Sequence, residues 1–163
     1  MTGREVRKIR AYNHSALVFG IWSTIGLSVT GSFQEIIAPI IHRTGALICS
    51  YFGFIYFWHQ TLISHLLIGK LNTARMANFR SCLSVISTII HFVAPFVIVH
   101  LDTTYPKPHV ETLVWTEKED GWPLHASCST MEWIIFIINE LYTASFYWEF
   151  KNIKINSDEV IFL

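Results

Sequence analysis

Three ionisable side chains stand inside stretches of sequence that are otherwise apolar: His59, His91 and Glu140. Each lies nine or ten residues from the charged end of its stretch. At ~1.5 Å per residue of helix, this spacing predicts that the three share one polar layer near the middle of a membrane. A carboxyl group in hydrocarbon is costly unless it is protonated or paired, and an imidazole is a suitable partner. We interpret the layer first as a structural hydrogen-bonded pair, with a proton relay or a metal site as the alternative.

The other polar residues of these stretches lie nearer the ends. Gln34 and Glu35 close the first stretch, and Glu132 comes early in the fourth. Glu149 falls at the far end of the fourth stretch, where we expect water to solvate it. The spacing of a zinc protease motif or of a serine nucleophile elbow is absent from the sequence. The sequence therefore predicts no catalytic residue, no bound metal and no cofactor.

Four apolar stretches must position these side chains: residues 15–33, 45–69, 82–101 and 128–150. Each is about as long as the roughly 20 residues that a spanning helix needs. The chain is 52% hydrophobic and only 15% charged, which is unusual for a soluble domain of 163 residues. We therefore predict an all-α fold, a four-helix membrane bundle that forms a single transmembrane domain over residues 1–163.

The first stretch carries small residues at every fourth position, which is typical of a ridge that lets another helix approach closely. We expect this ridge to pack against a helix, and a ligand groove along it is the minor alternative. Its members are Ala16, Gly20, Thr24, Ser28 and Ser32.

The distribution of basic residues predicts the orientation. Of the twelve Lys and Arg residues, nine fall in the N-terminus, the segment 70–81 or the C-terminal tail. The positive-inside rule therefore places both termini in the cytosol and the loop 102–127 in the lumen or outside the cell. We predict that residues 70–81 form a basic loop, and we expect this loop, or the tail, to contact a protein partner at anionic lipid. The net charge is zero, which gives no electrostatic basis for nucleic-acid binding.

Three segments together resemble the FRAG/DRAM/SFK superfamily, and among its branches the damage-regulated autophagy modulators. They read ALVFGIWSTIGLSVTGSFQE (16–35), HRTGALICSYFGFIYFWHQTLIS (42–64) and GWPLHASCSTMEWIIFIINELYTASFYWEF (121–150). The matching positions include four polar residues, which are Gln34, Glu35, Gln60 and Glu132. A bridge between Gln34 and Glu132 that joins the first and fourth helices is therefore expected. His59 stands where the family is usually apolar, so a site centred on it is not implied by the resemblance.

The resemblance implies a polytopic protein of lysosomal or related endomembranes that promotes autophagy and has no established enzymatic activity. Family members typically have six spans, so this chain resembles the last four. Other branches imply two lipid-linked alternatives, GPI-anchor remodelling in the Golgi and a scaffold for a phosphoinositide kinase at the plasma membrane. A lipid-modifying enzyme that uses Glu140, His59 and His91 is the competing interpretation. The sequence does not indicate the oligomeric state.

Overall fold

The computed structural model describes residues 2–107, 115–151, 153–155 and 160–162, and side chains up to residue 151. Four long helices make up most of it: α1 (Gly3–Ser32), α2 (Pro39–Leu66), α3 (Ala74–Thr104) and α4 (Trp122–Ala144). A short helix α5 (Tyr147–Lys151) and two strands, β1 (Ile153–Ile155) and β2 (Val160–Phe162), follow. The strands pair antiparallel, with Ile153 opposite Phe162. The all-α expectation is thus met by the four long helices, and this small terminal hairpin was not predicted.

The helices begin at recognisable capping residues. Thr2 and Glu5 form a reciprocal capping box at the start of α1, with bonds of 2.9 and 3.3 Å. The Thr73 hydroxyl accepts a hydrogen bond from the Met76 amide at the start of α3. Because α3 begins at Ala74, most of the segment 70–81 is helix, and the prediction that it is a loop was wrong for these residues.

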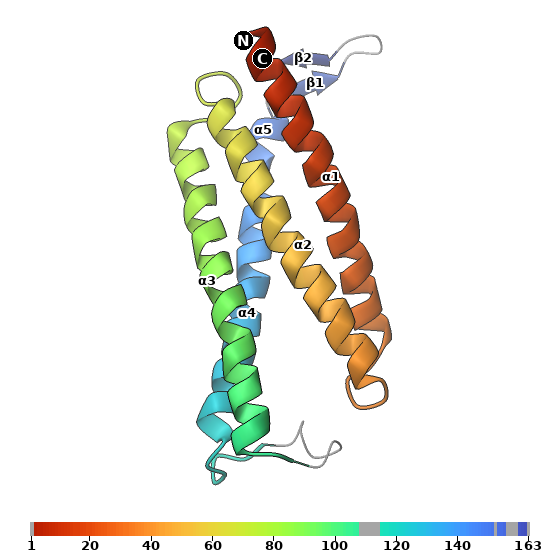
Figure 1. Cartoon of the computed structure of the whole chain (residues 1–163). Coiled ribbons are helices and arrows are strands. Elements are labelled where there is room, and N and C mark those ends of the chain that lie inside the picture. Colours follow the sequence, from red (N-terminus) through yellow and green to blue (C-terminus); the bar gives the residue numbers. More distant parts are fainter. Residues whose placement is uncertain (1, 108–114, 152, 156–159, 163) are drawn as a thin grey trace.

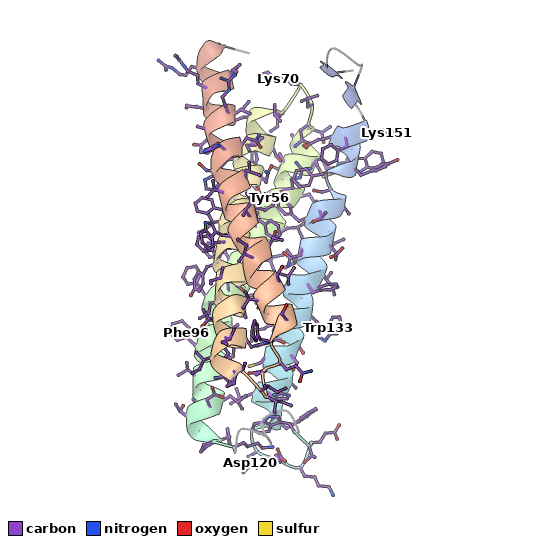
Figure 2. The ribbon with its side chains drawn as sticks, turned by 90° about the vertical axis from the view of Figure 1, so that its right-hand side faces the viewer. Tyr56, Lys70, Phe96, Asp120, Trp133 and Lys151 are labelled. Atoms are coloured by element: carbon purple, nitrogen blue, oxygen red, sulfur yellow. The ribbon has the colours of Figure 1, made fainter. Side chains whose placement is uncertain are left out.

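The helices run side by side along one axis (Figure 1). α2 packs on α1 and on α3, and α3 packs on α4. Along their lengths, α1 and α4 are not packed on one another in the described part of the chain. Both chain termini lie at the same end of the bundle as Lys70, and Asp120 lies at the opposite end (Figures 1 and 2). We call these the Lys70 end and the Asp120 end.

The core lies where α2, α3 and α4 meet. Phe57 and Tyr142 stack with ring centroids 4.2 Å apart, beside Leu83 and Ile138. The Tyr142 hydroxyl donates to the Phe57 carbonyl at 2.8 Å and therefore accepts from the Thr61 hydroxyl, also at 2.8 Å. A small hydrogen-bonded network thus joins the helices inside an apolar core, with its polar groups satisfied.

The closest contact between α1 and α2 depends on small residues. A Cβ atom added at Gly26 would lie 2.3 Å from the Cys49 amide nitrogen, and the Ser23 hydroxyl donates to the Cys49 carbonyl at 2.9 Å. A Cβ at Gly45 would lie 2.8 Å from the hydroxyl oxygen of Thr30. The helices therefore meet on a face next to the predicted ridge, not on the ridge itself.

The predicted ridge is left largely uncovered by this packing. Thr24, Ser28 and Ser32 are exposed, whereas Ala16 is buried. Gly20 faces the Tyr56 ring, to which an added Cβ would come within 3.4 Å. The expectation that the ridge packs against a helix is therefore met only at its Lys70 end.

The outer surface of the bundle is apolar. α1, α2 and α3 are each long and apolar enough to cross a membrane. Large side chains point outward from the bundle, among them Phe96 and Trp133, which are 76% and 67% exposed (Figure 2). Such a surface is stable in a lipid bilayer and not in water, so the chain is an integral membrane protein.

Candidate functional site

A buried arginine near the Lys70 end is the centre of the densest polar cluster in the described chain. The Arg80 side chain is 1% exposed because it lies in the second turn of α3, on the face that packs against α2 and α4. Its Nε donates to the Ser145 hydroxyl at 2.8 Å, and its Nη1 donates to the Ser64 hydroxyl at 2.5 Å. The same Nη1 also donates to the Glu149 carboxylate at 2.7 Å. We call these four residues the arginine clamp.

Aromatic rings enclose the guanidinium of Arg80. Its Cζ lies 4.1 Å from the ring centroid of Phe146 and 6.0 Å from that of Tyr142, so a cation–π attraction adds to the hydrogen bonds. The Nη2 atom is buried and has no hydrogen-bond partner among the described residues. The clamp contains no activated nucleophile, and its geometry fastens α2, α3 and the α4–α5 junction together.

Sequence reasoning missed Arg80 and misjudged its partner. Arg80 was counted among the residues of a basic loop, and Glu149 was expected to be solvated at the membrane surface. The Glu149 side chain is only 15% exposed and is paired with Arg80. The motif residue Gln60 lies next to the clamp, where its carbonyl accepts from the Ser64 hydroxyl at 2.9 Å. The Asn72-Thr73 pair, a helix-start signal, could have revealed that Arg80 lies inside a helix.

The three side chains of the predicted polar layer have separate surroundings. The His59 ring packs against Tyr12 and Phe19, with centroids 5.9 and 5.2 Å away. The His91 Nδ1 donates to a carbonyl one turn earlier in its own helix at 2.7 Å. Glu140 lies on α4 and lines a groove that neither histidine lines. No hydrogen bond joins any two of the three in the described chain, where no group of His, Cys, Asp and Glu could hold a metal ion.

That groove runs between α1 and α4, with α2 as its floor, and has a volume of about 960 Å³. On the α1 side, it is lined by the ridge residues Gly20, Thr24 and Ser28. The α4 side presents Asn139, Glu140 and Thr143. Most of the remaining lining is apolar, so the groove combines an apolar floor with one polar strip on each wall.

The Asp120 end carries an exposed ion-pair network. Arg43 Nε lies 3.2 Å from a Glu35 carboxylate oxygen, and its Nη1 lies 3.5 Å from one of Asp102. These pairs join the α1–α2 turn to the end of α3. Because their side chains are between 34% and 49% exposed, the pairs contribute little to stability and keep the helix ends in register.

Glu132 also lies at the Asp120 end. It is close enough to Glu35 and His42 for their charges to act on it. His42 caps the C-terminus of α1, since its Nδ1 donates to the Phe33 carbonyl at 2.7 Å. The hydrogen bond expected between Gln34 and Glu132 is not present among the described residues. Glu132 therefore contacts the α1–α2 turn through charge and not through that bridge.

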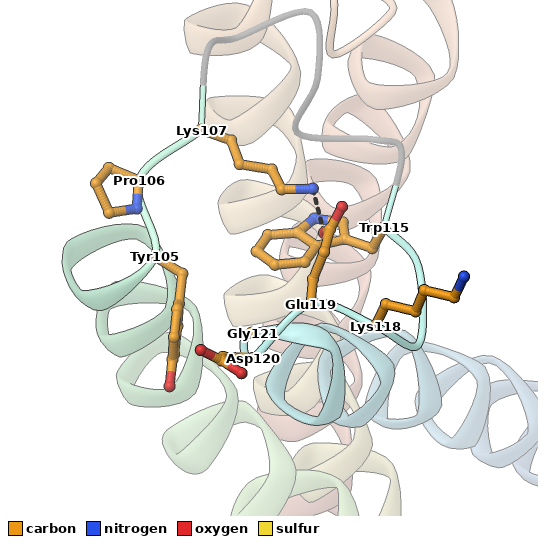
Figure 3. A pocket seen from close by; sticks show the side chains of 8 residues that line it. All are labelled: Tyr105, Pro106, Lys107, Trp115, Lys118, Glu119, Asp120 and Gly121. Carbon is orange, nitrogen blue, oxygen red and sulfur yellow. Dashed lines mark hydrogen bonds and ion pairs between the residues drawn. The ribbon is translucent and has the colours of Figure 1, made fainter.

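A small pocket of about 370 Å³ lies in the segment that connects α3 and α4 (Figure 3). The Lys107 ammonium sits 3.8 Å above the Trp115 ring and forms an ion pair with Glu119. The hydrogen bond from Lys107 holds the pKa of Glu119 below its usual value. Gly121 is needed here, because a Cβ would lie 2.4 Å from the Trp115 ring. Residues 108–114 of the predicted loop lie outside the described residues.

Comparisons with known proteins agree on one family. Residues 2–153 match the Frag1/DRAM/Sfk1/Cwh43P N-terminal domain. The DNA damage-regulated autophagy modulator protein 1 of Xenopus laevis is 26% identical over 88% of this chain and 57% of its own length. The human protein of the same name is 24% identical over 88% of this chain and 58% of its own. The modulator of macroautophagy TMEM150B of Danio rerio is 37% identical over 38% of this chain and 27% of its own.

The chain spans just over half the length of the first two of these relatives. No solved structure matches the chain. The family match covers all four long helices and the arginine clamp, which lies between residues 64 and 149. The chain therefore belongs to the Frag1/DRAM/Sfk1 family of membrane proteins.

Proposed function

We propose that this chain modulates autophagy as a multi-pass protein of the lysosomal membrane or a related endomembrane. The observation that carries the proposal is the family match over residues 2–153, together with relatives whose names describe autophagy modulators. An identity of 23–27% over most of the chain supports a shared role.

The proposed topology has four spans with both termini in the cytosol. α4 has 23 residues, which at 1.5 Å each gives about 34 Å, enough for a hydrocarbon core of about 30 Å. Glu132 and Glu140 interrupt the apolar run of α4, and among the described helices α1, α2 and α3 alone are apolar enough to cross a membrane by length and composition. The excess of Lys and Arg lies at the Lys70 end, which supports placing that end in the cytosol.

In this proposal the arginine clamp acts as a structural support. It stabilises the cytosolic ends of the helices, so that exposed basic residues such as Arg75 and Lys151 are presented on a fixed surface. Such a surface suits the recruitment of a protein partner near anionic lipid. No catalytic step is assigned to the chain.

The first test is the location of a C-terminally tagged copy at low expression, scored against lysosomal, Golgi and plasma-membrane markers. We expect lysosomal signal. Golgi or plasma-membrane signal would contradict the proposal and favour the lipid-linked alternatives.

The second test measures autophagic flux in cells that lack the endogenous protein. Wild-type chain should restore the turnover of a lipidated autophagosome marker, measured with and without a lysosomal protease inhibitor. Glu149→Gln should restore it poorly, since it leaves a buried cation unpaired, whereas Glu117→Gln, at an exposed glutamate near the Asp120 end, should restore it fully. Equal rescue by vector and wild type would refute the proposed role.

A further inference from the structure

The groove between α1 and α4 extends across most of the bundle. Its α1 wall runs from Ala16 to Phe33, a rise of about 26 Å, which approaches the thickness of the hydrocarbon core. A groove of that length and of about 960 Å³ is open along a whole side of the protein. In a membrane, either lipid chains or another helix must fill it.

Two side chains in the groove argue against filling by lipid chains alone. Asn139 and Glu140 are exposed on α4, and neither has a hydrogen-bond partner among the described residues. Both lie in the last two turns of α4, nine or ten residues before Glu149 of the clamp, so a helical rise of about 14 Å separates them from the charged Lys70 end. Polar groups in hydrocarbon are costly without a partner, so the occupant must bring hydrogen-bonding groups to this depth.

On the opposite wall, the Thr24 and Ser28 hydroxyls are already engaged as donors within α1 and keep only the capacity to accept. Thr24 donates to the Gly20 carbonyl at 2.9 Å, and Ser28 donates to the Thr24 carbonyl at 3.0 Å. These small residues instead allow a helix to come close to α1, since they present no bulky side chain. The α1 wall therefore fits a helix backbone, and the α4 wall requires a polar partner.

We propose that the occupant is α4 of a second copy of this chain, so that the protein is a homodimer. In a membrane the twofold axis of such a dimer is parallel to the bilayer normal, so each residue meets its equivalent at the same depth. The Asn139 carboxamide donates and accepts, and the Glu140 carboxyl group accepts, so Glu140 of one copy and Asn139 of the other are complementary. The symmetry forms this pair twice.

The dimer also explains the uncovered ridge. α4 of each copy enters the groove of the other and packs against Gly20, Thr24 and Ser28, which gives a four-helix interface made of two α1 and two α4 helices. Phe136 and Thr143 flank the polar pair on α4 and lie on the same side as it, so they border the α4–α4 contact. The proposal depends on the membrane topology and not on the role in autophagy.

Disulfide cross-linking in native membranes tests the contact directly. The three native cysteines, Cys49, Cys82 and Cys128, are replaced by alanine. Single cysteines are then introduced as Phe136→Cys or Thr143→Cys on α4, with Ile89→Cys on the outer face of α3 as the matched control. We expect oxidation to trap a dimer for both α4 positions, at least tenfold more than for the control. Equal cross-linking at all three positions would overturn the proposal.

Substitutions in the polar pair test its chemistry. Glu140→Leu should lower the dimer association constant in liposomes roughly tenfold, which corresponds to about 1.4 kcal/mol. Glu140→Gln, which keeps an acceptor on a side chain of the same shape, should stay within about threefold of wild type. In the ridge, Ser28→Leu should weaken the dimer, and Val18→Leu, on an exposed α1 position outside the groove, should not.

Dimer fractions are measured by single-molecule photobleaching over a range of protein-to-lipid ratios, and far-UV circular dichroism checks that each variant is folded. A folded wild-type protein that stays monomeric at every ratio would overturn the proposal. A monomer that carries a tightly bound lipid in native mass spectrometry would overturn it as well, and would identify the groove as a lipid site.

Discussion

The arginine clamp gives the sharpest prediction about stability. Removal of one partner from a buried ion pair typically costs about 3–5 kcal/mol, because the other charge is left uncompensated. Glu149→Gln leaves the guanidinium of Arg80, which is 1% exposed, without its anion, so we expect a loss of about 4 kcal/mol. Arg80→Met should cost less, about 3 kcal/mol, since Glu149 is 15% exposed and can turn toward water.

The serines of the clamp soften the effect of losing Arg80. The Ser64 hydroxyl donates to the Gln60 carbonyl at 2.9 Å, and the Ser145 hydroxyl donates to a carbonyl of its own helix at 2.6 Å. Both hydroxyls therefore keep a partner when the guanidinium is removed. The ion pair between Arg80 and Glu149, and not the serine hydrogen bonds, should therefore account for most of the free energy that the clamp contributes to folding.

A double-mutant cycle isolates that coupling. Arg80→Met combined with Glu149→Gln removes both charges, so the double variant should be more stable than the sum of the single losses predicts, by about 2 kcal/mol. The free energy of unfolding is followed by far-UV circular dichroism in mixed micelles with increasing denaturing detergent. Glu35→Gln, which removes one member of an exposed ion pair, is the control and should cost less than about 1 kcal/mol. Additive losses for the clamp would refute the reasoning.

Other predictions use the same unfolding assay or fluorescence. Gly26→Ala should cost about 3 kcal/mol, because its Cβ would lie 2.3 Å from a backbone nitrogen of α2, whereas Gly31→Ala, with nothing within 4 Å, should be near neutral. Tyr142→Phe should cost about 1 kcal/mol, since it removes the buried hydrogen bonds to the Phe57 carbonyl and from the Thr61 hydroxyl, which keeps its bond with Ser84. The lowered pKa of Glu119 means that its ion pair contributes stability above the usual carboxyl value and loses it as the pH falls through the folded pKa. The fluorescence of Trp115 is obtained by subtracting the spectrum of the Trp115→Phe variant from that of the wild type. It should change only below about pH 4.3.

The sequence was sufficient for the class of fold because hydrophobic length alone determines which segments can cross a membrane. Each of the four predicted stretches overlaps one long helix, but α2 ends at Leu66 and α4 at Ala144, before the predicted ends at residues 69 and 150. The third stretch was predicted to begin at residue 82, and α3 begins at Ala74. The error arose because three basic residues suggested an aqueous loop, and a buried arginine cannot be told from an exposed one without knowing its partner.

The predicted ridge shows a second limit of sequence reasoning. Small residues occur on two adjacent faces of α1, at every fourth position through Gly20 and Thr24 and three residues apart at Ser23 and Gly26. Sequence spacing identifies both as candidates for close packing. Only the position of α2 determines which is used, and the Cβ contacts at Gly26 show that it is the second.

The three glutamates in or near α4 differ in how their charges are compensated. This difference indicates which of them stabilises the fold and which is available to bind a partner. Glu149 is paired with the buried cation of Arg80, so its charge is compensated within the chain. Glu132 lies at the end of the bundle, within range of His42 and near water. Glu140 alone lies in an open groove, about 14 Å of helical rise from the clamp, without a hydrogen-bond partner among the described residues. An uncompensated polar group at that depth is stable only when something outside the chain completes it, so Glu140 is the position at which this protein is expected to meet its partner.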